Sequence, residues 1–414
     1  MPGLITERNF PTSWTIKRFK YCAQICNGGE YSDIEVEEGG YPVIGSGGEF
    51  ARASKFSYCG KSVLLGRKGT VDKPLFVDGA FWCVDTMFYT KIKDFVYEKY
   101  LYYCALCFPF DYYVTSTALP SMTQRDLGSQ EIAVPPKKEQ KAIADFLDKE
   151  CAQIDSIAAD LEKQIALLQQ YKKSLITETV TKGLDKSVPM KDSRLEWLGK
   201  IPAHWNFIRL KFMLENSSDS MKVGPFGSAL SGSDFTDEGK WVYNQRVVLD
   251  NNFSENTTFV SEEKFQEMRS FAVYPGDILI TTRGTIGKVA IVPEGANEGI
   301  LHPCIIKFRV DKEMIIPELL QLIFNESDFV KDQFTLMSNA TTIEVIYSYS
   351  LKDILLPVIP ADEQEKIYGY LSKKCIAIDG IIAEKQKALA TITKHKKSLI
   401  YEYVTGKKRV KEVQ

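Results

Sequence analysis

Residues 136–181 read PKKEQKAIADFLDKECAQIDSIAADLEKQIALLQQYKKSLITETVT, and residues 360–405 read PADEQEKIYGYLSKKCIAIDGIIAEKQKALATITKHKKSLIYEYVT. Both stretches carry a Glu-Gln pair near their start and a Lys-Lys-Ser-Leu-Ile run near their end. They align without a gap, because the offset is 224 residues both from Glu139 to Glu363 and from Thr181 to Thr405. Self-similarity of this kind indicates a duplicated structural unit. The ungapped alignment indicates that the length of this part is constrained.

Apolar residues recur every seventh position in both stretches, which is the pattern of a coiled-coil seam. Pro136 suits a first helical turn, and Gly183 suits a helix end. Helices this long cannot cover their apolar stripe on a small globule, so we expect the two to pack on each other, antiparallel and related by a pseudo-twofold axis. Only Lys385 interrupts the pattern. The predicted seam residues are Leu147, Ile154, Leu161, Leu168, Leu175, Leu371, Ile378, Leu389, Ile392 and Leu399.

A weaker repeat precedes each long stretch. Pro11-Thr-Ser-Trp14 resembles Pro202-Ala-His-Trp205 at an offset of 191 residues, and Gly69-Thr70-Val71 resembles Gly284-Thr285-Ile286 at an offset of 215 residues. The drifting offset indicates that these front portions tolerate insertions. Gly-rich turns and strand-like runs predict mixed α/β globules. The runs are Ser62–Leu65, Asp277–Thr282 and Gly299–Val310.

The predicted fold is therefore α+β, with two α/β globular domains separated by two long antiparallel helices that form a coiled coil. If the two halves are cyclically equivalent, Thr405 should lie near Pro11 much as Thr181 leads to Pro202. The predicted boundaries are 1–135 for the first globular domain, 136–183 for the central helix, 184–200 for a connector, 201–359 for the second globular domain, 360–406 for the C-terminal helix and 407–414 for a basic tail.

The composition limits which classes of protein this chain can belong to. A chain of 414 residues can form two or more domains, and 52 Lys plus Arg against 54 Asp plus Glu argue against binding nucleic acid by bulk basicity. The nine scattered cysteines predict free thiols, and the sequence contains neither an apolar membrane span nor a signal core, so we expect a cytoplasmic protein. The pairs Cys22 with Cys26 and Cys104 with Cys107 have spacings that could hold zinc, but their hydrophobic surroundings favour core residues.

Motifs for catalysis are missing from the sequence. Gly60-Lys61-Ser62 has Lys55 where a phosphate loop requires its first glycine, and Gly287-Lys288 is followed by valine. The chain contains no Asn-Pro pair, so the Asn-Pro-Pro-aromatic signature of adenine methyltransferases is absent. We therefore expect a non-catalytic chain that binds no metal and no cofactor of its own.

The ordered motifs resemble those of the specificity subunit of a type I restriction-modification system, over essentially the whole chain. Three pieces carry the resemblance: Pro135-Pro-Lys-Lys-Glu-Gln140 with its counterpart at 360–364, the connector from Met190 through Trp197 to Trp205, and the turn Gly224-Pro-Phe-Gly-Ser-Ala-Leu230. Each piece is weak alone, and their order together with the repeat makes the assignment strong.

That resemblance implies a function. Each globule would be a target-recognition domain reading one part of a bipartite, asymmetric site on double-stranded DNA, and the helices would set the spacer between the parts. The helices would also dock two methyltransferase subunits, which carry S-adenosylmethionine and methylate adenine. An ATP-driven restriction subunit could join the assembly.

Candidate DNA contacts lie on loops of the globules. Lys68 and Arg283 occupy matched positions, each before a glycine and after a strand-like run, and arginine suits bidentate contact with guanine or phosphate. A turn with a solvated charge explains these positions equally well. The complete candidate set is Ser46, Arg52, Arg67, Lys68, Gly69, Thr115, Ser116, Ser228, Asn244, Gln245, Arg246, Arg283, Gly284 and Thr285.

Other basic residues have simpler interpretations. Lys172, Lys173, Lys396 and Lys397 are expected to complement helix C-termini. The tail from Lys407 to Lys411 is expected to be a frayed, solvated end, with phosphate contact as the alternative. Two other classes of function compete with DNA recognition: a single-chain restriction or methylation enzyme, and a coiled-coil interaction protein. The missing cofactor motifs count against the first, and the large, aromatic-rich front portions count against the second.

Overall fold

The computed structural model describes residues 11–112, 120–195, 197–226, 229–338 and 345–410. The chain divides into two compact units: unit 1 contains residues 1–163 and 385–414, and unit 2 contains residues 164–384. Each unit therefore combines one globular domain with a segment of each long helix. Three candidate residues, Thr115, Ser116 and Ser228, lie outside the described residues.

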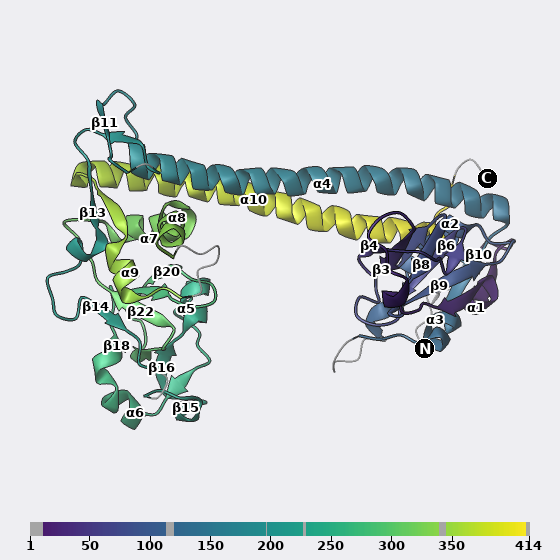
Figure 1. The fold of residues 1–414 in the computed structure, drawn as a ribbon, viewed down its shortest axis with the longest axis horizontal. Helices are drawn as coiled ribbons and strands as arrows, with labels where there is room; N and C mark the ends of the chain where they lie inside the picture. The colour runs from purple at the N-terminus through teal and green to yellow at the C-terminus, as the bar shows by residue number, and fades with distance from the viewer. Residues whose placement is uncertain (1–10, 113–119, 196, 227–228, 339–344, 411–414) are drawn as a thin grey trace. The chain divides into compact units, whose positions relative to one another are not determined.

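Two helices dominate the chain: α4 spans Lys137–Lys182 and α10 spans Ala361–Val404. Pro136 and Pro360 precede them, and their carbonyls accept the first helical hydrogen bonds. Both helices stop before a glycine with positive φ, 73° at Gly183 and 74° at Gly406, a backbone conformation that glycine adopts without strain. In each unit a segment of α4 lies beside a segment of α10 (Figure 1).

Unit 1 contains three sheets. A two-stranded sheet pairs β1 with β10, a four-stranded sheet has the order β2-β9-β6-β7, and a second four-stranded sheet has the order β4-β3-β8-β5. The strands are β1 Thr15–Arg18, β2 Ala23–Asn27, β3 Tyr41–Gly45, β4 Gly48–Ala53, β5 Tyr58–Cys59, β6 Ser62–Gly66, β7 Leu75–Val77, β8 Ala80–Cys83, β9 Met87–Ile92 and β10 Glu131–Val134. The short helices are α1 Phe19–Cys22, α2 Glu98–Leu106 and α3 Gln124–Ser129, with 3-10 turns η1 Ser32–Ile34 and η2 Phe110–Tyr112.

Unit 2 repeats this plan. Its sheets have the orders β13-β23, β14-β22-β19-β20 and β15-β17-β16-β21-β18, and the connector adds the hairpin β11-β12. The strands are β11 Met190–Asp192, β12 Lys200–Pro202, β13 Asn206–Arg209, β14 Met221–Val223, β15 Phe235–Thr236, β16 Lys240–Tyr243, β17 Phe259–Val260, β18 Ala272–Val273, β19 Ile278–Thr281, β20 Val289–Ile291, β21 Gly299–Leu301, β22 Ile305–Phe308 and β23 Leu355–Val358. The helices are α5 Gln245–Asp250, α6 Glu262–Glu267, α7 Pro317–Glu326, α8 Phe329–Ser338 and α9 Ser348–Asp353, with 3-10 turns η3 Leu210–Phe212, η4 Gly232–Asp234 and η5 Arg269–Phe271.

These two repeated units, each with paired segments of the long helices, confirm the predicted α+β class and the internal repeat. The predicted strand-like runs at Ser62 and Asp277 correspond to β6 and β19. The run Gly299–Val310 is interrupted, because the Ile305 amide donates to the His302 carbonyl at 3.0 Å and turns the chain between β21 and β22. The polar connector contains an ordered hairpin.

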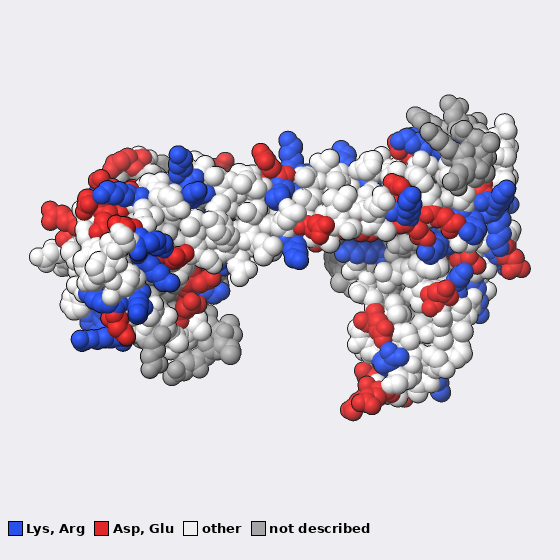
Figure 2. Space-filling view, turned by 90° about the horizontal axis from the view of Figure 1, so that it is seen from above, with Lys and Arg blue, Asp and Glu red and all other residues white. Residues whose placement is uncertain are grey.

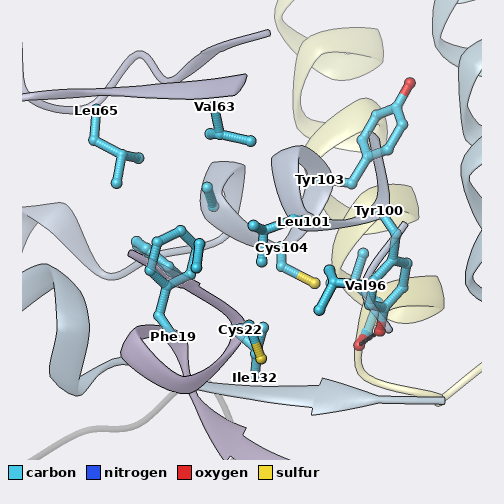
Figure 3. Packing of buried hydrophobic residues seen from close by; sticks show 14 of the residues in the cluster. Phe19, Cys22, Val63, Leu65, Val96, Tyr100, Leu101, Tyr103, Cys104 and Ile132 are labelled. Atoms are coloured by element: carbon cyan, nitrogen blue, oxygen red, sulfur yellow. Dashed lines mark hydrogen bonds between the residues drawn. The ribbon is translucent and has the colours of Figure 1, made fainter. Parts of the chain in front are cut away.

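The ends of the long helices complete the two main cores. In unit 1, Leu147 and Cys151 of α4 and Ile400 and Val404 of α10 belong to the same cluster as Trp14. Cys22 of α1 and Cys104 of α2 point into this interior between β6 and β10 (Figure 3). In unit 2, Ile176 and Val180 of α4 and Leu371 and Cys375 of α10 pack with Trp205. Each globule therefore depends on both helices for its core.

Gly406 lies against the start of unit 1. A Cβ atom on Gly406 would come within 3.1 Å of Pro11 Cδ, and one on Gly183 would come within 3.8 Å of Pro202 Cγ. The chain thus passes from Thr405 to the neighbourhood of Pro11 as it does from Thr181 to Pro202, which confirms the predicted cyclic equivalence. None of the described helices is apolar over a stretch long enough to cross a membrane.

Candidate nucleic-acid interface and helix junctions

In unit 2 the predicted contact residues form one surface group. Arg283, Gly284 and Thr285 follow β19 and are exposed, and Gly284 has a φ of 65°. The Gln245 side-chain amide donates to the Thr285 carbonyl at 3.4 Å. Asn244 caps α5, because its side-chain oxygen accepts from the backbone amides of Arg246 and Val247. The structure therefore brings together two segments that the sequence only proposed separately.

Arg246 is a highly accessible cation of this group, since 79% of its side chain is exposed. It lines a small surface cavity of about 100 Å³ with Asn244, Asp250 and Asn256. Its ion pair with Asp250, from Nε at 3.4 Å, joins neighbours on the same exposed helical turn and is worth roughly a few tenths of a kcal/mol. The guanidinium can therefore exchange that carboxylate for an external anion.

In unit 1 the matching loop is Arg67–Gly69, directly after β6. Arg67 donates from Nη1 to the Asp85 carbonyl at 3.2 Å, and its guanidinium lies 5.9 Å from the Phe88 ring centroid. Lys68 is exposed. An isolated antiparallel bridge joins Lys68 to Ser121, just as one joins Arg283 to Val345 in unit 2. The two loops thus have the same backbone support, with Lys68 and Arg283 as the outward cations.

Two further candidates occupy the β3–β4 hairpin. Ser46 lies in its turn and is half-buried. Arg52 donates from Nη2 to the Gly40 carbonyl at 3.0 Å and from Nη1 to Glu49 at 2.8 Å. These contacts commit the Arg52 guanidinium to its own hairpin, so it is a weaker candidate for DNA contact than Lys68.

The Pro-x-x-Glu-Gln motif builds the same junction in each unit. Glu139 accepts from the Trp14 indole at 3.1 Å, and Glu363 accepts from the Trp205 indole at 3.1 Å. Both glutamates thereby anchor the repeated tryptophan of a globule, Trp14 or Trp205, to the first turn of a long helix.

The neighbouring glutamine clamps a second helix. Gln140 accepts from the Tyr97 amide at 2.7 Å, at the N-terminus of α2, and donates to the Phe95 and Pro135 carbonyls at 3.1 and 2.8 Å. Gln364 accepts from the Ile316 amide at 2.9 Å, at the N-terminus of α7, and donates to two equivalent carbonyls. The motif therefore fixes the direction in which each long helix leaves its globule.

The basic tail is partly structured, contrary to the expectation of a frayed end. Arg409 donates to Glu139 Oε1 from Nε at 3.0 Å and from Nη2 at 2.8 Å. Lys408 pairs with Glu402 at 2.8 Å. Glu139 is 5% exposed, so one oxygen of a buried carboxylate gains two charge-assisted hydrogen bonds from the tail. Lys411 lies outside the described residues.

The expectation that Lys172 and Lys396 complement helix C-termini is wrong. Lys172 pairs with Asp379 at 2.8 Å and Glu326 at 2.9 Å, and Lys396 pairs with Asp155 at 2.6 Å. Burial lowers the pKa of Lys172, but the hydrogen bonds and charges of its two carboxylate partners outweigh burial and raise it overall. Lys173 pairs with Asp328 at 3.2 Å. Cross-element pairing, and not the helix dipole, occupies these three lysines.

The predicted seam residues are all buried or half-buried: Leu147, Ile154, Leu161, Leu168, Leu175, Leu371, Ile378, Leu389, Ile392 and Leu399. Sequence reasoning missed Ile176, Val180, Ile400 and Val404, which are more deeply buried than Leu175 and Leu399. They lie one residue after heptad positions, on the helix faces that pack into the cores of the globules.

All nine cysteines are free thiols. Burial raises the pKa of Cys22 to about 11 and that of Cys107 to about 12, and it raises the pKa of Cys104 well above its usual value. A metal ligand must be a thiolate, so these environments disfavour zinc. Within the described ranges, His, Cys, Asp and Glu side chains form no group that could hold a metal ion.

Comparisons with known proteins agree with the duplicated fold. The family described as type I restriction modification DNA specificity domain matches residues 11–167 and 223–391. The MjaVIII specificity subunit of Methanocaldococcus jannaschii is 26% identical over 302 residues, which cover 72% of this chain and 66% of the relative. The EcoBI specificity subunit of Escherichia coli is 24% identical over 351 residues, which cover 80% of this chain and 72% of the relative. This chain thus spans about two thirds of the length of the MjaVIII subunit.

A solved structure shows the same fold. A chain from a structure described as the basis of complex assembly and conformational transition of the type I R-M system superposes with a TM-score of 0.67 at 14% identity. The match covers 97% of this chain and all of that chain.

Proposed function

Because the chain belongs to the family of type I restriction-modification DNA specificity domains, we propose that it is the DNA sequence-specificity subunit of a type I restriction-modification complex. Each globular domain reads one half of a bipartite, asymmetric site on double-stranded DNA. The observation that carries the proposal is the duplicated reading loop: Lys68 and Arg283 are exposed cations on loops with equivalent backbone bridges. The residues around them differ between the units, as two different half-sites require.

The long helices set the spacer between the half-sites and dock two methyltransferase subunits. The equivalent junctions at Glu139 and Glu363 support this assignment, because each fixes a long helix to its globule by the same contacts. Half-site spacing in any two-headed DNA-binding protein is a geometric property of the element that joins the heads. A restriction subunit is a further partner of the complex.

The chain is a recognition subunit and not a catalyst by itself. The proposal places S-adenosylmethionine on the methyltransferase subunits and ATP on the restriction subunit, with no cofactor on this chain. The missing phosphate loop and Asn-Pro pair support it. We also propose a cytoplasmic location, where the DNA and the partner subunits are present.

The experiment that tests the proposal is the adenine methylome of a host expressing this chain with its methyltransferase subunit. We expect a bipartite, asymmetric methylated motif that disappears in a matched host lacking this chain. A methyltransferase that is expressed and folded but leaves no motif in either host would contradict the proposed function.

Assigning each half of the motif to a unit uses two variants. Lys68→Ala should weaken or relax methylation at one half-site, and Arg283→Ala should do so at the other, because a good bidentate contact contributes about 1–3 kcal/mol of discrimination. Loss at the same half-site in both variants would contradict the division of labour.

A further inference from the structure

The turn that follows the first strand of each globule has the same four-residue pattern. It reads Arg18-Phe19-Lys20-Tyr21 in unit 1 and Arg209-Leu210-Lys211-Phe212 in unit 2, at an offset of 191 residues. The preceding tryptophans, Trp14 and Trp205, have the same offset. We call these two segments the basic-aromatic turns. These turns are separate from the loops of Lys68 and Arg283 and from the helix junctions at Glu139 and Glu363.

The two turns have the same backbone anchor. The Phe19 amide donates to the Gln130 carbonyl at 2.8 Å, and the Leu210 amide donates to the Ile354 carbonyl at 2.7 Å. Phe19 and Leu210 are completely buried, so core packing explains the apolar position of the pattern. It does not explain the other three positions, which are exposed in both units.

The lysine and the aromatic ring form the same couple on both surfaces. Lys20 Nζ lies 5.1 Å from the Tyr21 ring centroid, and Lys211 Nζ lies 5.1 Å from the Phe212 ring centroid. Tyr21 is 58% exposed and Phe212 is 64% exposed. A cation held over an exposed ring contributes about 0.5–1 kcal/mol, and the ring restricts where the ammonium can point. Although the two globules differ in length and loops, each places one lysine ammonium at the same distance from an exposed aromatic ring.

Both turns adjoin the reading loops. In unit 1, α1 packs against α3, which begins three residues after the Ser121 bridge to Lys68. In unit 2, η3 packs against α9, which begins three residues after the Val345 bridge to Arg283. One short helix thus connects each basic-aromatic turn with the outward cation of its reading loop.

The charges of the turns are available to an anion. Within the described part of the chain, Arg18 and Lys20 make no ion pair. In unit 2, Asp353 pairs with Arg209 at 3.4 Å and with Lys211 at 3.9 Å, but all three side chains are more than a third exposed. Exposed pairs of this kind contribute about 0–1 kcal/mol, so a phosphate can replace Asp353.

We propose that the basic-aromatic turns are twin phosphate contacts, which hold the DNA backbone beside each half-site without reading its sequence. The proposal rests on the proposed function and deepens it. Residues that read bases must differ between two different half-sites, whereas backbone contacts position the protein on any sequence and can stay the same. The chain also needs local cations, since its formal net charge is −2 and side chains of both signs are interspersed on the face shown in Figure 2.

The test uses the complex of the full chain with its methyltransferase subunits and duplexes with or without the recognised motif. The variant is Lys20→Gln with Lys211→Gln, and affinity is measured between about 0.05 and 0.3 M salt. We expect affinity for both duplexes to fall by the same factor, roughly thirtyfold at 0.15 M salt, because two phosphate contacts are lost. The slope of log affinity against log salt should decrease in magnitude by about 1.8. The methylated motif should stay unchanged.

The matched control removes the same charge from other exposed positions. Lys55→Gln with Lys312→Gln changes two exposed lysines, one in each globular domain, outside the reading loops and the long helices. This variant should retain the wild-type slope. Lys20→Arg with Lys211→Arg preserves the charge and should also retain it.

Four outcomes would overturn the proposal. An unchanged affinity and slope in the glutamine variant would exclude phosphate contact. An equal decrease in the control would assign the effect to net charge alone. Dissociation of the methyltransferase subunits at unchanged intrinsic slope would make the turns a protein-docking surface instead. A wild-type complex that does not prefer the recognised motif would contradict the proposed function itself, and this inference with it.

Discussion

Lys172 of α4 donates two hydrogen bonds to the Asp379 carboxylate of α10, at 2.9 and 2.8 Å. Lys396 of α10 donates two to Asp155 of α4, at 2.6 and 2.7 Å. Residues 155 and 379, like residues 172 and 396, are equivalent at the repeat offset of 224. Each unit thus contains the same aspartate–lysine pair with the roles of the two helices exchanged, which is the pattern of an interface between related partners. Both pairs specify one antiparallel register.

The two pairs should differ in strength. Only 11% of the Lys172 side chain is exposed and Glu326 adds a second carboxylate, whereas 29% of the Lys396 side chain and 60% of Asp155 are exposed. We expect double-mutant cycles to give a coupling of about 1–2 kcal/mol for Lys172 with Asp379, and about 0.5 kcal/mol for Lys396 with Asp155. Urea denaturation of the full chain measures both. Equal couplings would contradict the role assigned to burial.

The pH dependence of the Lys172 contribution follows from its raised pKa. The pKa of an unfolded lysine is about 10.4, and the pKa of Lys172 in the folded protein is higher. Below about pH 10.4 the charged lysine therefore contributes its full stabilisation to the folded state. This stabilisation is lost as the pH rises through the pKa of the folded state. The coupling should therefore be constant between about pH 6 and pH 9 and decrease above about pH 10.4. A coupling that disappears near neutral pH would show that Lys172 is not the titrating partner.

The buried glutamines of the helix junctions should be essential for local stability. Replacing Gln140, which is 1% exposed, with leucine leaves the Tyr97 amide and two carbonyls without their partner. Each unsatisfied buried group costs about 1–3 kcal/mol, so we expect a loss of at least about 2 kcal/mol. Hydrogen exchange should accelerate in α2 after Gln140→Leu and in α7 after Gln364→Leu. Gln153→Leu, at an exposed position of α4, is the control and should change neither.

Asp277 organises a cluster of charged side chains in the interior of unit 2. It is 1% exposed and pairs with Arg309 at 2.5 Å and Lys307 at 3.3 Å, and Lys307 is itself 2% exposed. At the corresponding place in β6, Ser62 and Thr90 form a network of hydroxyl hydrogen bonds instead. Asp277→Ala should destabilise unit 2 by about 3–5 kcal/mol, because it leaves the buried Lys307 without its buried carboxylate partner.

The effect of Asp277→Ala on DNA recognition can be measured from the methylated motif. Recognition of one half-site should fail while the complex still forms through unit 1. Asp219→Ala removes the more exposed partner of Lys307, at 3.5 Å, and should cost less than about 1 kcal/mol. Similar losses in both variants would mean that burial of Asp277 does not determine its effect.

The long helices could be predicted from the sequence more completely than the contacts of the surface side chains. Both helices and their antiparallel pairing follow from the ungapped 224-residue offset and the heptad pattern. The length and the periodicity of a helix can be taken directly from the amino-acid sequence. Contacts between distant residues are not visible in this way. From the sequence, Arg409 was expected to be a solvated tail charge and Lys172 a helix-end charge. Only the tertiary structure shows that their partners are Glu139 and Asp379.

The basic-aromatic turns show a signal that could have been used. Lys20 and Lys211 have the same offset as Trp14 and Trp205, so extending that weak repeat by a few residues finds them. Arg52 illustrates the opposite case, because nothing in the sequence indicates that its guanidinium binds the Gly40 carbonyl. A role can be assigned to a basic residue in a loop only when the contacts of its side chain in the folded protein are known.

The proximity of Gly406 to Pro11 makes a circular permutant feasible. The permutant joins residue 414 to residue 1 and opens the chain before Asp185, an exposed position beyond the end of α4. Chains tolerate new termini at exposed loops where few contacts cross. We expect a folded protein that supports methylation of the same motif. A permutant opened before Ala158, inside α4, is the control and should lose activity. Equal failure of both permutants would contradict the equivalence of the two junctions.

The spacer prediction depends on the helices alone. Seven residues inserted after Lys163 and seven after Lys387, which are equivalent positions, preserve the heptad pattern of both seams. The insertions add about 10.5 Å at 1.5 Å per residue, or about three base pairs at 3.4 Å each. The methylated motif should keep both half-sites and gain about three base pairs between them. Four residues inserted in the connector after Ser187 leave both helices intact and should leave the spacer unchanged. A helix-extended protein that methylates the original motif would exclude the helices as the element that sets the spacing.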